Sequence, residues 1–389
     1  MRVRFGELLP EERLNYEIVR SRAREAWHQL RDGDAERACR SIADIDSRLE
    51  LAVFDDQRDG RRAELSAFES SAWPLAELLL AQAPSDVGCA LMLGRSASPL
   101  SQALTDLRET HQLDLARATL RAGFGRGHLL EVTLGIPGGA GAENEQNAAE
   151  NLVRAVIGER LFETWIGVVH AAPAPRLPSL RVLDVSARHA ALSVDDLFAT
   201  VAAAVLGVLR GLPTAPHGAS PSAEAATSES EDASRSEWTL LEVEPLAEKR
   251  AGRKDDLLLA STCTPELLRC YLDGSPCSSR RFSRIGEQFV FVSYADDEPT
   301  MARRVARRTV IERALSECVA GSGAVTGVGF GVKTTYVDLA LYDLEAGLLN
   351  LISRLRQLDV PAQTFIQFFD SELEEEWLSI WPDSRLNDR

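Results

Sequence analysis

Two stretches of this chain show the same order of features, and that order limits the folds open to it. Gly123-Phe124-Gly125 and, later, Gly329-Phe330-Gly331 each precede a strand-like run, a helical pattern and a second strand-like run. These segments are residues 129–134, 147–157 and 164–169 in the first stretch, and 336–341, 344–355 and 364–369 in the second. The repeated order predicts two related α+β modules, that is, an internal duplication.

Composition indicates how the rest of the chain is divided. Residues 213–236 are dominated by Pro, Ala, Ser, Thr, Glu and Asp, and such a segment cannot bury enough apolar surface to fold. We therefore predict a disordered linker there, between a first α+β module at 122–212 and a second at 237–389. Apolar residues at helical spacing predict an N-terminal helical domain at 1–121, including one helix from residue 34 and another from residue 60.

Both modules are predicted to be ferredoxin-like, with a split β-α-β sheet that carries helices on one face. In the first we also expect a strand at 180–185, and the apolar run 197–209 predicts a buried helix. In the second we expect strands at 238–243, 256–260 and 288–294 and helices at 265–272 and 298–319. Ser371 and Glu374 form a capping-box pattern, which predicts a final helix.

Charge and hydropathy argue against several classes of protein. The formal net charge of −16 repels phosphate, which disfavours general nucleic-acid binding and binding to anionic membranes. Without a run of about 20 apolar residues or an N-terminal apolar leader, we expect a cytoplasmic protein. Only three basic residues are lysine, and the arginines are mixed with more numerous acids. This favours a compositional bias over a dedicated anion-binding surface.

The cysteines and histidines predict no metal and no cofactor. Cys263, Cys270 and Cys277 recur every seven residues, a spacing that matches no zinc pattern, and no histidine lies close by. The six histidines are dispersed along the chain. The glycines of the two repeats allow a phosphate-binding interpretation, but a phosphate loop leads into the N-terminus of a helix, and these precede strands. Helix caps or close backbone approaches are the favoured interpretation for Gly123, Gly125, Gly327, Gly329 and Gly331.

Two acids in the predicted strands are candidate site residues. Asp338 lies in the middle of its strand, and Glu131 has a comparable place in the first repeat. An acid in a central strand must face solvent or a cleft, or pair with a base. An open sheet face is the favoured interpretation, and the alternative is a site that both acids share.

The strongest local charge signal is a set of arginines around the predicted strand at 288–294. They are Arg280, Arg281 and Arg284 before it, and Arg303, Arg304 and Arg307 after it, with Arg308 following. Helical spacing places Arg303 and Arg307 on the same stripe as Val310, Ala314 and Cys318, which is the predicted buried face. These arginines therefore pair with acids of the protein itself or bind an anionic ligand.

These patterns favour a non-enzymatic, cytoplasmic regulatory or protein-interaction protein whose two pseudo-symmetric modules bind a protein partner. The alternative is an effector sensor that binds an anion or nucleotide through the arginines at 280–308. A second alternative is a hydrolase or transferase built around Asp338. No nucleophile–base pair or nucleotide fingerprint supports an enzyme, so that class is less favoured. The oligomeric state stays open.

Overall fold

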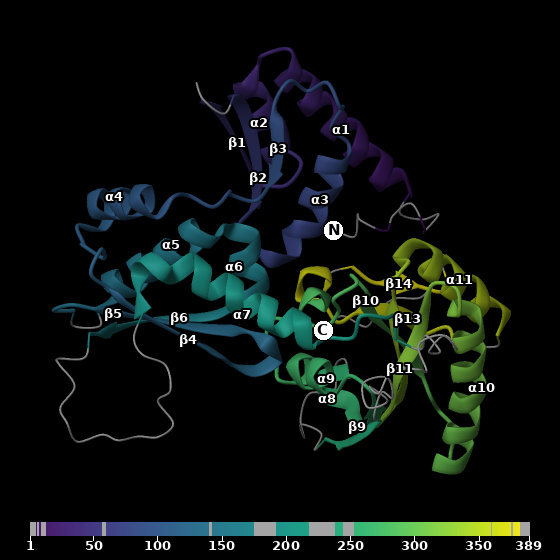
Figure 1. Cartoon of the computed structure of the whole chain (residues 1–389). Coiled ribbons are helices and arrows are strands. Elements are labelled where there is room, and N and C mark those ends of the chain that lie inside the picture. Colours follow the sequence, from purple (N-terminus) through teal and green to yellow (C-terminus); the bar gives the residue numbers. More distant parts are fainter. Residues whose placement is uncertain are drawn as a thin grey trace, which may run out of the picture. The chain divides into compact units, whose positions relative to one another are not determined.

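The computed structural model describes residues 5, 8, 13–56, 60–139, 142–174, 192–217, 238–243, 253–358, 360–374 and 376–381. The chain divides into two compact units (Figure 1). The two-sheet unit is Arg20–Leu209, and the seven-strand unit combines Met1–Val19 with Arg210–Arg389. The predicted strand at 180–185 and most of the predicted linker at 213–236 lie outside the described residues. The described part has no helix long and apolar enough to cross a membrane.

The two-sheet unit begins with helices and then forms a three-stranded sheet. Helix α1 is anchored where the Trp27 indole N–H donates to the Leu79 carbonyl at 2.7 Å. The sheet has the order β1-β2-β3, with β1 and β2 antiparallel and β2 and β3 parallel. The elements are α1 (Arg13–Arg31), α2 (Ala35–Ala43), β1 (Leu49–Asp56), β2 (Gly60–Ala67), η1 (Ser70–Ala72), α3 (Trp73–Ala81) and β3 (Ala90–Leu93).

The prediction that residues 1–121 are helical was therefore wrong over β1, β2 and β3. Leu49 and Leu51 are buried and alternate with partly exposed neighbours, which is the period of a strand. The prediction joined Leu49 and Val53 to the preceding helix at a spacing of four. The apolar positions fit both periods over so short a run, and only pairing with β2 selects the strand.

A four-stranded sheet follows in the same unit, with the order β6-β5-β4-β7. Strands β5 and β6 are adjacent and parallel, and α5 and α6 connect them. Leu130, Val132 and Leu134 of β5 are buried in one apolar core with Leu152 and Val153 of α5. The elements are α4 (Leu100–His111), β4 (Thr119–Phe124), η2 (Arg126–His128), β5 (Leu130–Ile136), α5 (Glu143–Ile157), α6 (Glu159–Trp165), β6 (Ile166–Pro173), β7 (Leu192–Ser193), η3 (Val194–Asp196) and α7 (Leu197–Gly211).

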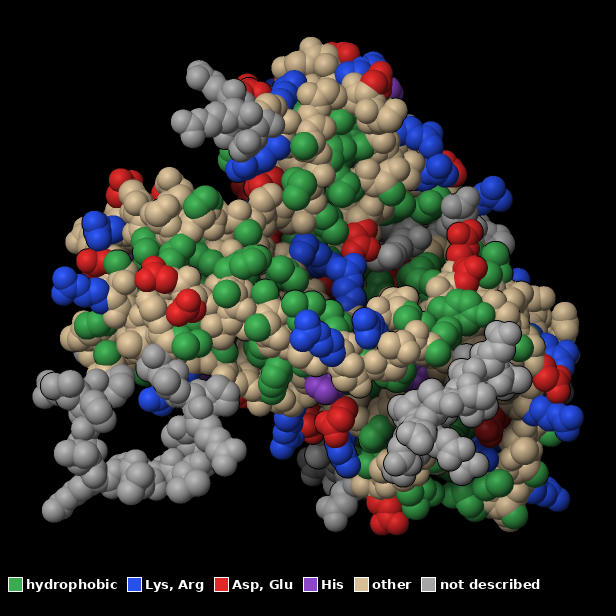
Figure 2. All heavy atoms as spheres, viewed as in Figure 1, with side chains coloured by type: hydrophobic (Ala, Val, Ile, Leu, Met, Phe, Trp, Pro, Cys, Tyr) green, Lys and Arg blue, Asp and Glu red, His purple; other side chains and the backbone are tan. Residues whose placement is uncertain are grey.

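Helix α7 is present where the apolar run 197–209 predicted it, but only one side of the helix is fully buried. Leu197 and Val201 are buried, whereas Phe198 and Leu206 are about half exposed. Figure 2 shows hydrophobic side chains reaching the surface over the helices of this sheet. The prediction that this helix is buried was wrong for its second face, because hydropathy alone does not say whether another element covers that face.

The seven-strand unit is built on one antiparallel sheet with the order β14-β13-β10-β12-β11-β9-β8. Helix α11 connects β12 to β13, and strand β10 lies between these two strands. Helix α10 connects β10 to β11, and strand β12 lies between them. The elements are β8 (Thr239–Glu242), α8 (Arg253–Asp256), β9 (Leu257–Thr262), α9 (Pro265–Leu272), η5 (Ser279–Arg281), β10 (Gln288–Ala295), α10 (Met301–Val319), β11 (Gly323–Gly331), β12 (Thr334–Leu341), α11 (Leu344–Gln357), β13 (Thr364–Phe368), η6 (Ser371–Leu373) and β14 (Leu378–Ser379).

The two repeats of the sequence therefore differ in how their strands pair. In the first repeat the strands on either side of the helix are neighbours, while in the second another strand separates them. The order strand, helix, strand is present in both, but the internal duplication is not shown. The repeated order of strand, helix and strand is a local pattern along the chain. Which strands pair in the second repeat depends on β10, which lies outside the repeat.

Both faces of the central strand β12 are covered. Val337 and Leu339 pack in one core with side chains of α10 and α11, and Phe5 joins this core by stacking on Phe368 at 4.9 Å. Tyr336 and Ala340 pack in a second core with side chains of α9. The expected open sheet face was therefore wrong for this strand.

Two helix boundaries in this unit also differ from the prediction. Helix α10 begins at Met301, where the Thr300 hydroxyl accepts from the Arg303 N–H, so the predicted start at 298 was early. After Ser371 the chain forms one 3₁₀ turn and the short strand β14 instead of the predicted final helix. Pairing of Leu378 with Ile366 of β13 outweighs the capping-box pattern there.

Candidate functional site

Asp338 forms a buried ion pair with Arg253. The Arg253 Nη1 atom lies 2.6 Å from Oδ1 of Asp338, and Nη2 donates to Oδ2 at 2.8 Å. The two side chains are 0% and 2% exposed. The Arg253 guanidinium carbon also lies 4.6 Å from the ring centre of Phe291 and about as close to two further rings, those of Tyr336 and Phe369. Asp338 thus has a base as its partner rather than solvent.

The glycines of the second repeat lie inside strand β11, not in a loop before a strand. Gly327 is opposite Asp338, and a Cβ atom on it would lie 2.6 Å from Oδ2 of Asp338. A Cβ on Gly329 would lie 2.8 Å from a Leu257 methyl carbon, and one on Gly331 would overlap the Asp256 carboxylate. Each glycine thus allows a close approach between neighbouring segments.

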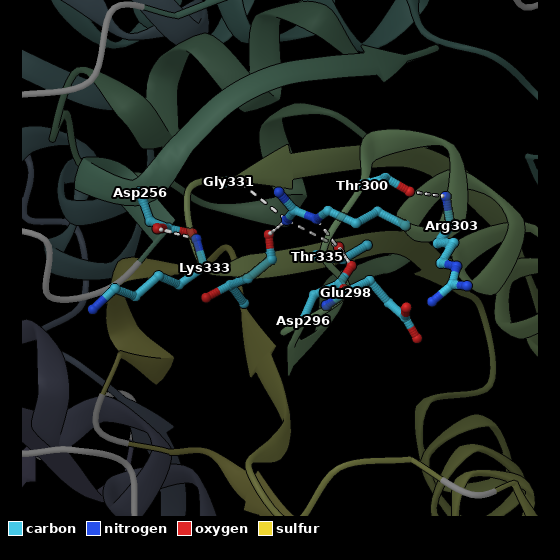
Figure 3. A network of polar contacts seen from close by, with 10 residues as sticks. Asp256, Asp296, Glu298, Thr300, Arg303, Gly331, Lys333 and Thr335 are labelled. Atoms are coloured by element: carbon cyan, nitrogen blue, oxygen red, sulfur yellow. Dashed lines mark hydrogen bonds and ion pairs between the residues drawn. The ribbon is translucent and has the colours of Figure 1, made fainter.

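Arg304 is the centre of a second buried network, and Figure 3 shows its partners Asp296, Gly331 and Thr335. Its Nε donates to Oδ2 of Asp296 at 3.2 Å, and its Nη2 donates to the carbonyl oxygens of Gly331 and Thr334 at 3.0 and 3.2 Å. The Thr335 hydroxyl donates to the same Asp296 oxygen at 2.6 Å. This arginine ties the first turn of α10 to the turn between β11 and β12.

The remaining candidate arginines do not converge on one point. Arg281 is buried, Arg307 is half-buried, and Arg280, Arg284 and Arg303 are exposed. In Figure 3 the side chains of Arg303 and Lys333 extend in opposite directions from the network. The described geometry therefore gathers no group of cations around a space for an anion.

The predicted buried stripe of α10 was wrong in its first half, whereas Ala314 is buried and Cys318 packs against the core as predicted. Arg304, Ile311 and Leu315 face the core, whereas Val310 is 63% exposed. The prediction put Arg303 and Arg307 inward because Val310 was counted as a core position. Placing Arg304 inward instead gives its guanidinium the carboxylate of Asp296 as a partner.

The candidates of the first repeat belong to the two-sheet unit. Gly123 pairs with Glu131 across β4 and β5, and a Cβ on Gly125 would lie 2.6 Å from Oε1 of Glu131. Glu131 is exposed, whereas Asp338 is enclosed within the other unit. Asp338 therefore has its charge partner, Arg253, within its own unit.

A cluster that the sequence did not suggest joins His217 to Glu287. The His217 Nδ1 atom lies 2.9 Å from Oε2 of Glu287, and the Ser283 hydroxyl donates to the same oxygen at 2.9 Å. Burial raises the pKa of Glu287, but the hydrogen bonds and charge of His217 outweigh this and lower it. Because serine and histidine both contact the carboxylate, the described contacts do not form a serine–histidine relay. Seventy residues separate the partners, so no local pattern could show this cluster.

Asp370 is a second buried acid that the sequence did not single out. It accepts from the Ser279 N–H at 2.8 Å and also from the Ser279 hydroxyl and the Gln288 amide. Burial raises the pKa of Asp370 to about 6, although the hydrogen bonds from Ser279 act in the opposite direction.

Asp370 is expected to titrate near pH 6, above its ordinary value of 3.8. Because the folded state keeps this proton to a higher pH than the unfolded chain, the contribution of Asp370 to the free energy of unfolding falls as the pH rises from about 4 to about 6. The loss is about 1.4 kcal/mol per pKa unit. Carboxyl-carbon NMR shifts would give the midpoint. Asp46 is the control, since its hydrogen bond from Arg48 lowers its pKa. A midpoint for Asp370 at or below that of Asp46 would contradict the expectation.

A groove between β8 and α10 lies on the surface of the seven-strand unit. It has a volume of about 330 Å³ and is lined by Trp238, Thr309, Glu312, Arg313, Ser316, Glu317 and Val325. Trp238 is 51% exposed, Leu240 of β8 is 62% exposed and Val310 of α10 is 63% exposed. One sequence pattern could have indicated this exposed apolar surface. Leu240 and Leu241 are consecutive in a strand, so one of them must point away from the core.

Strand β8 is an end strand of the sheet in the described part of the chain. The Val243 N–H donates to the Leu258 carbonyl of the neighbouring segment at 2.9 Å. In an antiparallel ladder the direction of these groups alternates, so the N–H and C=O groups of Leu240 and Glu242 point to the outer edge. An outer edge of this kind can pair with another strand.

Comparisons with known proteins add no assignment to this geometry. Protein-family models, curated proteins and solved structures give no match to the chain. Within the described residues, no group of three or more His, Cys, Asp or Glu side chains could hold a metal ion.

Proposed function

We propose that this chain is a non-enzymatic regulatory protein that binds a protein partner in the groove between β8 and α10. The observation that carries the proposal is the combination of an outer strand edge with exposed Trp238 beside it. Tryptophan is enriched among the residues that dominate binding energy at protein interfaces. We also infer that β10, α10, β11, β12, α11 and β13 follow the ferredoxin-like order, with their strands arranged β13-β10-β12-β11.

The occupant that best fits this groove is an extended segment of another protein. Such a segment can pair with the outward N–H and C=O groups of Leu240 and Glu242 as an additional strand. An apolar side chain of the segment would pack against Trp238. Glu312 and Glu317 in the groove pair with Arg308 at 3.4 Å and with Arg313 at 3.1 Å, so the attraction for a cation comes from the net charge of −16 of the whole chain. A basic side chain in the bound segment would therefore be favoured.

A binding role is also supported by the way the candidate acids are used. The candidate Asp338, like the buried Asp296, is paired with a buried arginine, so neither is placed to exchange a proton with a substrate. The exposed arginines that an anion sensor would need do not gather around one space. These observations favour the protein-binding hypothesis over both alternatives.

Selection of peptides from a displayed library of random 12-residue sequences would test this function. The selected peptides are expected to combine apolar and basic residues and to bind the wild-type protein in a fluorescence-polarisation titration. Trp238→Ala should weaken binding about 30-fold, which corresponds to roughly 2 kcal/mol for a central interface tryptophan. Bound peptide should also slow amide hydrogen exchange at Leu240 and Glu242.

Phe68→Ala is the matched control, because Phe68 is a 63% exposed aromatic residue on the other unit. It should leave the affinity unchanged. The proposal fails if no peptide is enriched, or if the enriched peptides bind Trp238→Ala as tightly as the wild type.

A further inference from the structure

Two cysteine side chains share one buried site in the seven-strand unit. Cys270 lies in the last turn of α9 and Cys277 in the loop that follows, and they are 1% and 4% exposed. The loop returns onto the helix, since the Ser275 N–H donates to the Cys270 carbonyl at 3.2 Å. The Cys277 sulfur lies 3.9 Å from the carbonyl oxygen of Leu267, one turn before Cys270. This return of the loop places the two thiols close enough to change each other's pKa.

A buried arginine lies against this pair. Arg281 is 1% exposed, and its Nη2 atom lies 3.7 Å from the Cys270 sulfur and donates to the Pro276 carbonyl. The hydrogen bond from Cys277 and the charge of Arg281 lower the pKa of Cys270 to about 7, although burial acts in the opposite direction. The same contact raises the pKa of Cys277. Of the two thiols, Cys270 is therefore the one that ionises more readily.

A small cavity borders the pair on the side of Cys277. It has a volume of about 20 Å³, and Tyr271, Ser275, Cys277 and Asp370 contribute to its walls. A cavity of roughly 10–15 Å³ is enough to hold one water molecule, so a molecule of similar size fits beside Cys277.

We propose that Cys270 and Cys277 form a dithiol that hydrogen peroxide oxidises to a disulfide. The Cys270 thiolate attacks one peroxide oxygen, the O–O bond breaks, and the departing hydroxide takes up a proton to become water. Cys270 is then a sulfenic acid. The Cys277 sulfur attacks the Cys270 sulfur, the S–O bond breaks, and the second hydroxide leaves as water with the Cys277 proton. Two thiols and one hydrogen peroxide thus give one disulfide and two water molecules.

Peptide mapping by mass spectrometry after peroxide treatment of the folded full-length protein tests this site. The wild type should lose two hydrogen atoms in a peptide that links Cys270 to Cys277. Cys277→Ser should instead gain one or two oxygen atoms at Cys270, whereas Cys270→Ser should leave Cys277 reduced. At neutral pH Cys270 should react roughly tenfold or more faster than Cys318, whose pKa burial raises.

The pH dependence separates a reactive pair from ordinary slow oxidation. The rate of Cys270 modification in the wild type should reach half its maximum near pH 7 and move to higher pH in Cys277→Ala, which lacks the thiol hydrogen bond. Cys318→Ser is the control and should change neither the disulfide nor the midpoint. The proposal is overturned if Cys270 and Cys277 stay reduced while Cys318 is oxidised, or if Cys277 reacts at the wild-type rate without Cys270.

Discussion

Replacing Asp338 by asparagine is expected to lower the free energy of unfolding of the seven-strand unit by about 3 to 4 kcal/mol. The substitution keeps the shape of the side chain but leaves the Arg253 charge without its counterion, in a position with no solvent exposure. The three aromatic rings around the guanidinium offset part of this loss, because a cation over a buried ring gains up to about 2 kcal/mol. Urea denaturation followed by amide exchange in β12 would measure the change.

The matched control is Glu266→Gln, which removes one partner of an exposed ion pair in the same unit. An exposed pair of this kind contributes only about 0–1 kcal/mol. The double variant Arg253→Met with Asp338→Leu removes both charges, and it should cost less than Asp338→Asn alone. If Asp338→Asn is no more destabilising than Glu266→Gln, then solvent or another acid stabilises the Arg253 charge in place of Asp338.

Replacing Arg304 by methionine should destabilise the same unit by about 3 to 5 kcal/mol, because it leaves a buried carboxylate unpaired. The side chain of Asp296 has no exposed surface, and without Arg304 its Oδ2 keeps the Thr335 hydroxyl as its described partner. The carbonyl groups of Gly331 and Thr334 also lose their contact with the guanidinium. Hydrogen exchange should become faster in the turn between β11 and β12, which the arginine holds to α10.

Arg303→Met is the control for this prediction, because the two arginines are adjacent in the sequence and only Arg304 is buried. Exposed substitutions of this kind usually change stability by about 0.5 kcal/mol or less. A second comparison uses Asp296→Asn with Arg304→Met, which should recover part of the stability. Equal effects of Arg303→Met and Arg304→Met would mean that the buried pair adds nothing to stability.

Much of the secondary structure of the seven-strand unit followed from local pattern. The predicted helix at 265–272 matches α9, and the predicted strands at 256–260, 288–294 and 336–341 correspond to β9, β10 and β12. These segments combine a clear apolar period with turn residues or caps at their ends. Residues 49–67 have no such clear apolar period, because their apolar positions fit both helical and strand spacing.

The candidate site depended much more on tertiary structure. The sequence pointed to Asp338, but its partner Arg253 is 85 residues away, and no local pattern links the two residues. The arginines at 280–308 formed one group along the chain, yet the fold buries Arg281 and Arg304 in separate places and leaves Arg280, Arg284 and Arg303 exposed. Trp238 and Leu240 became candidates only when β8 was placed at the end of the sheet.

The sequence by itself determined the α+β character of this protein, because apolar spacing and capping residues act over a few positions along the chain. Only the tertiary structure decided the order β14-β13-β10-β12-β11-β9-β8, the covering of both faces of β12, and the contact between Cys270 and Cys277. Strand order and burial depend on contacts between segments far apart in sequence. The same long-range contacts decide which residues become charge partners or neighbouring thiols. Local sequence patterns therefore cannot predict these pairs.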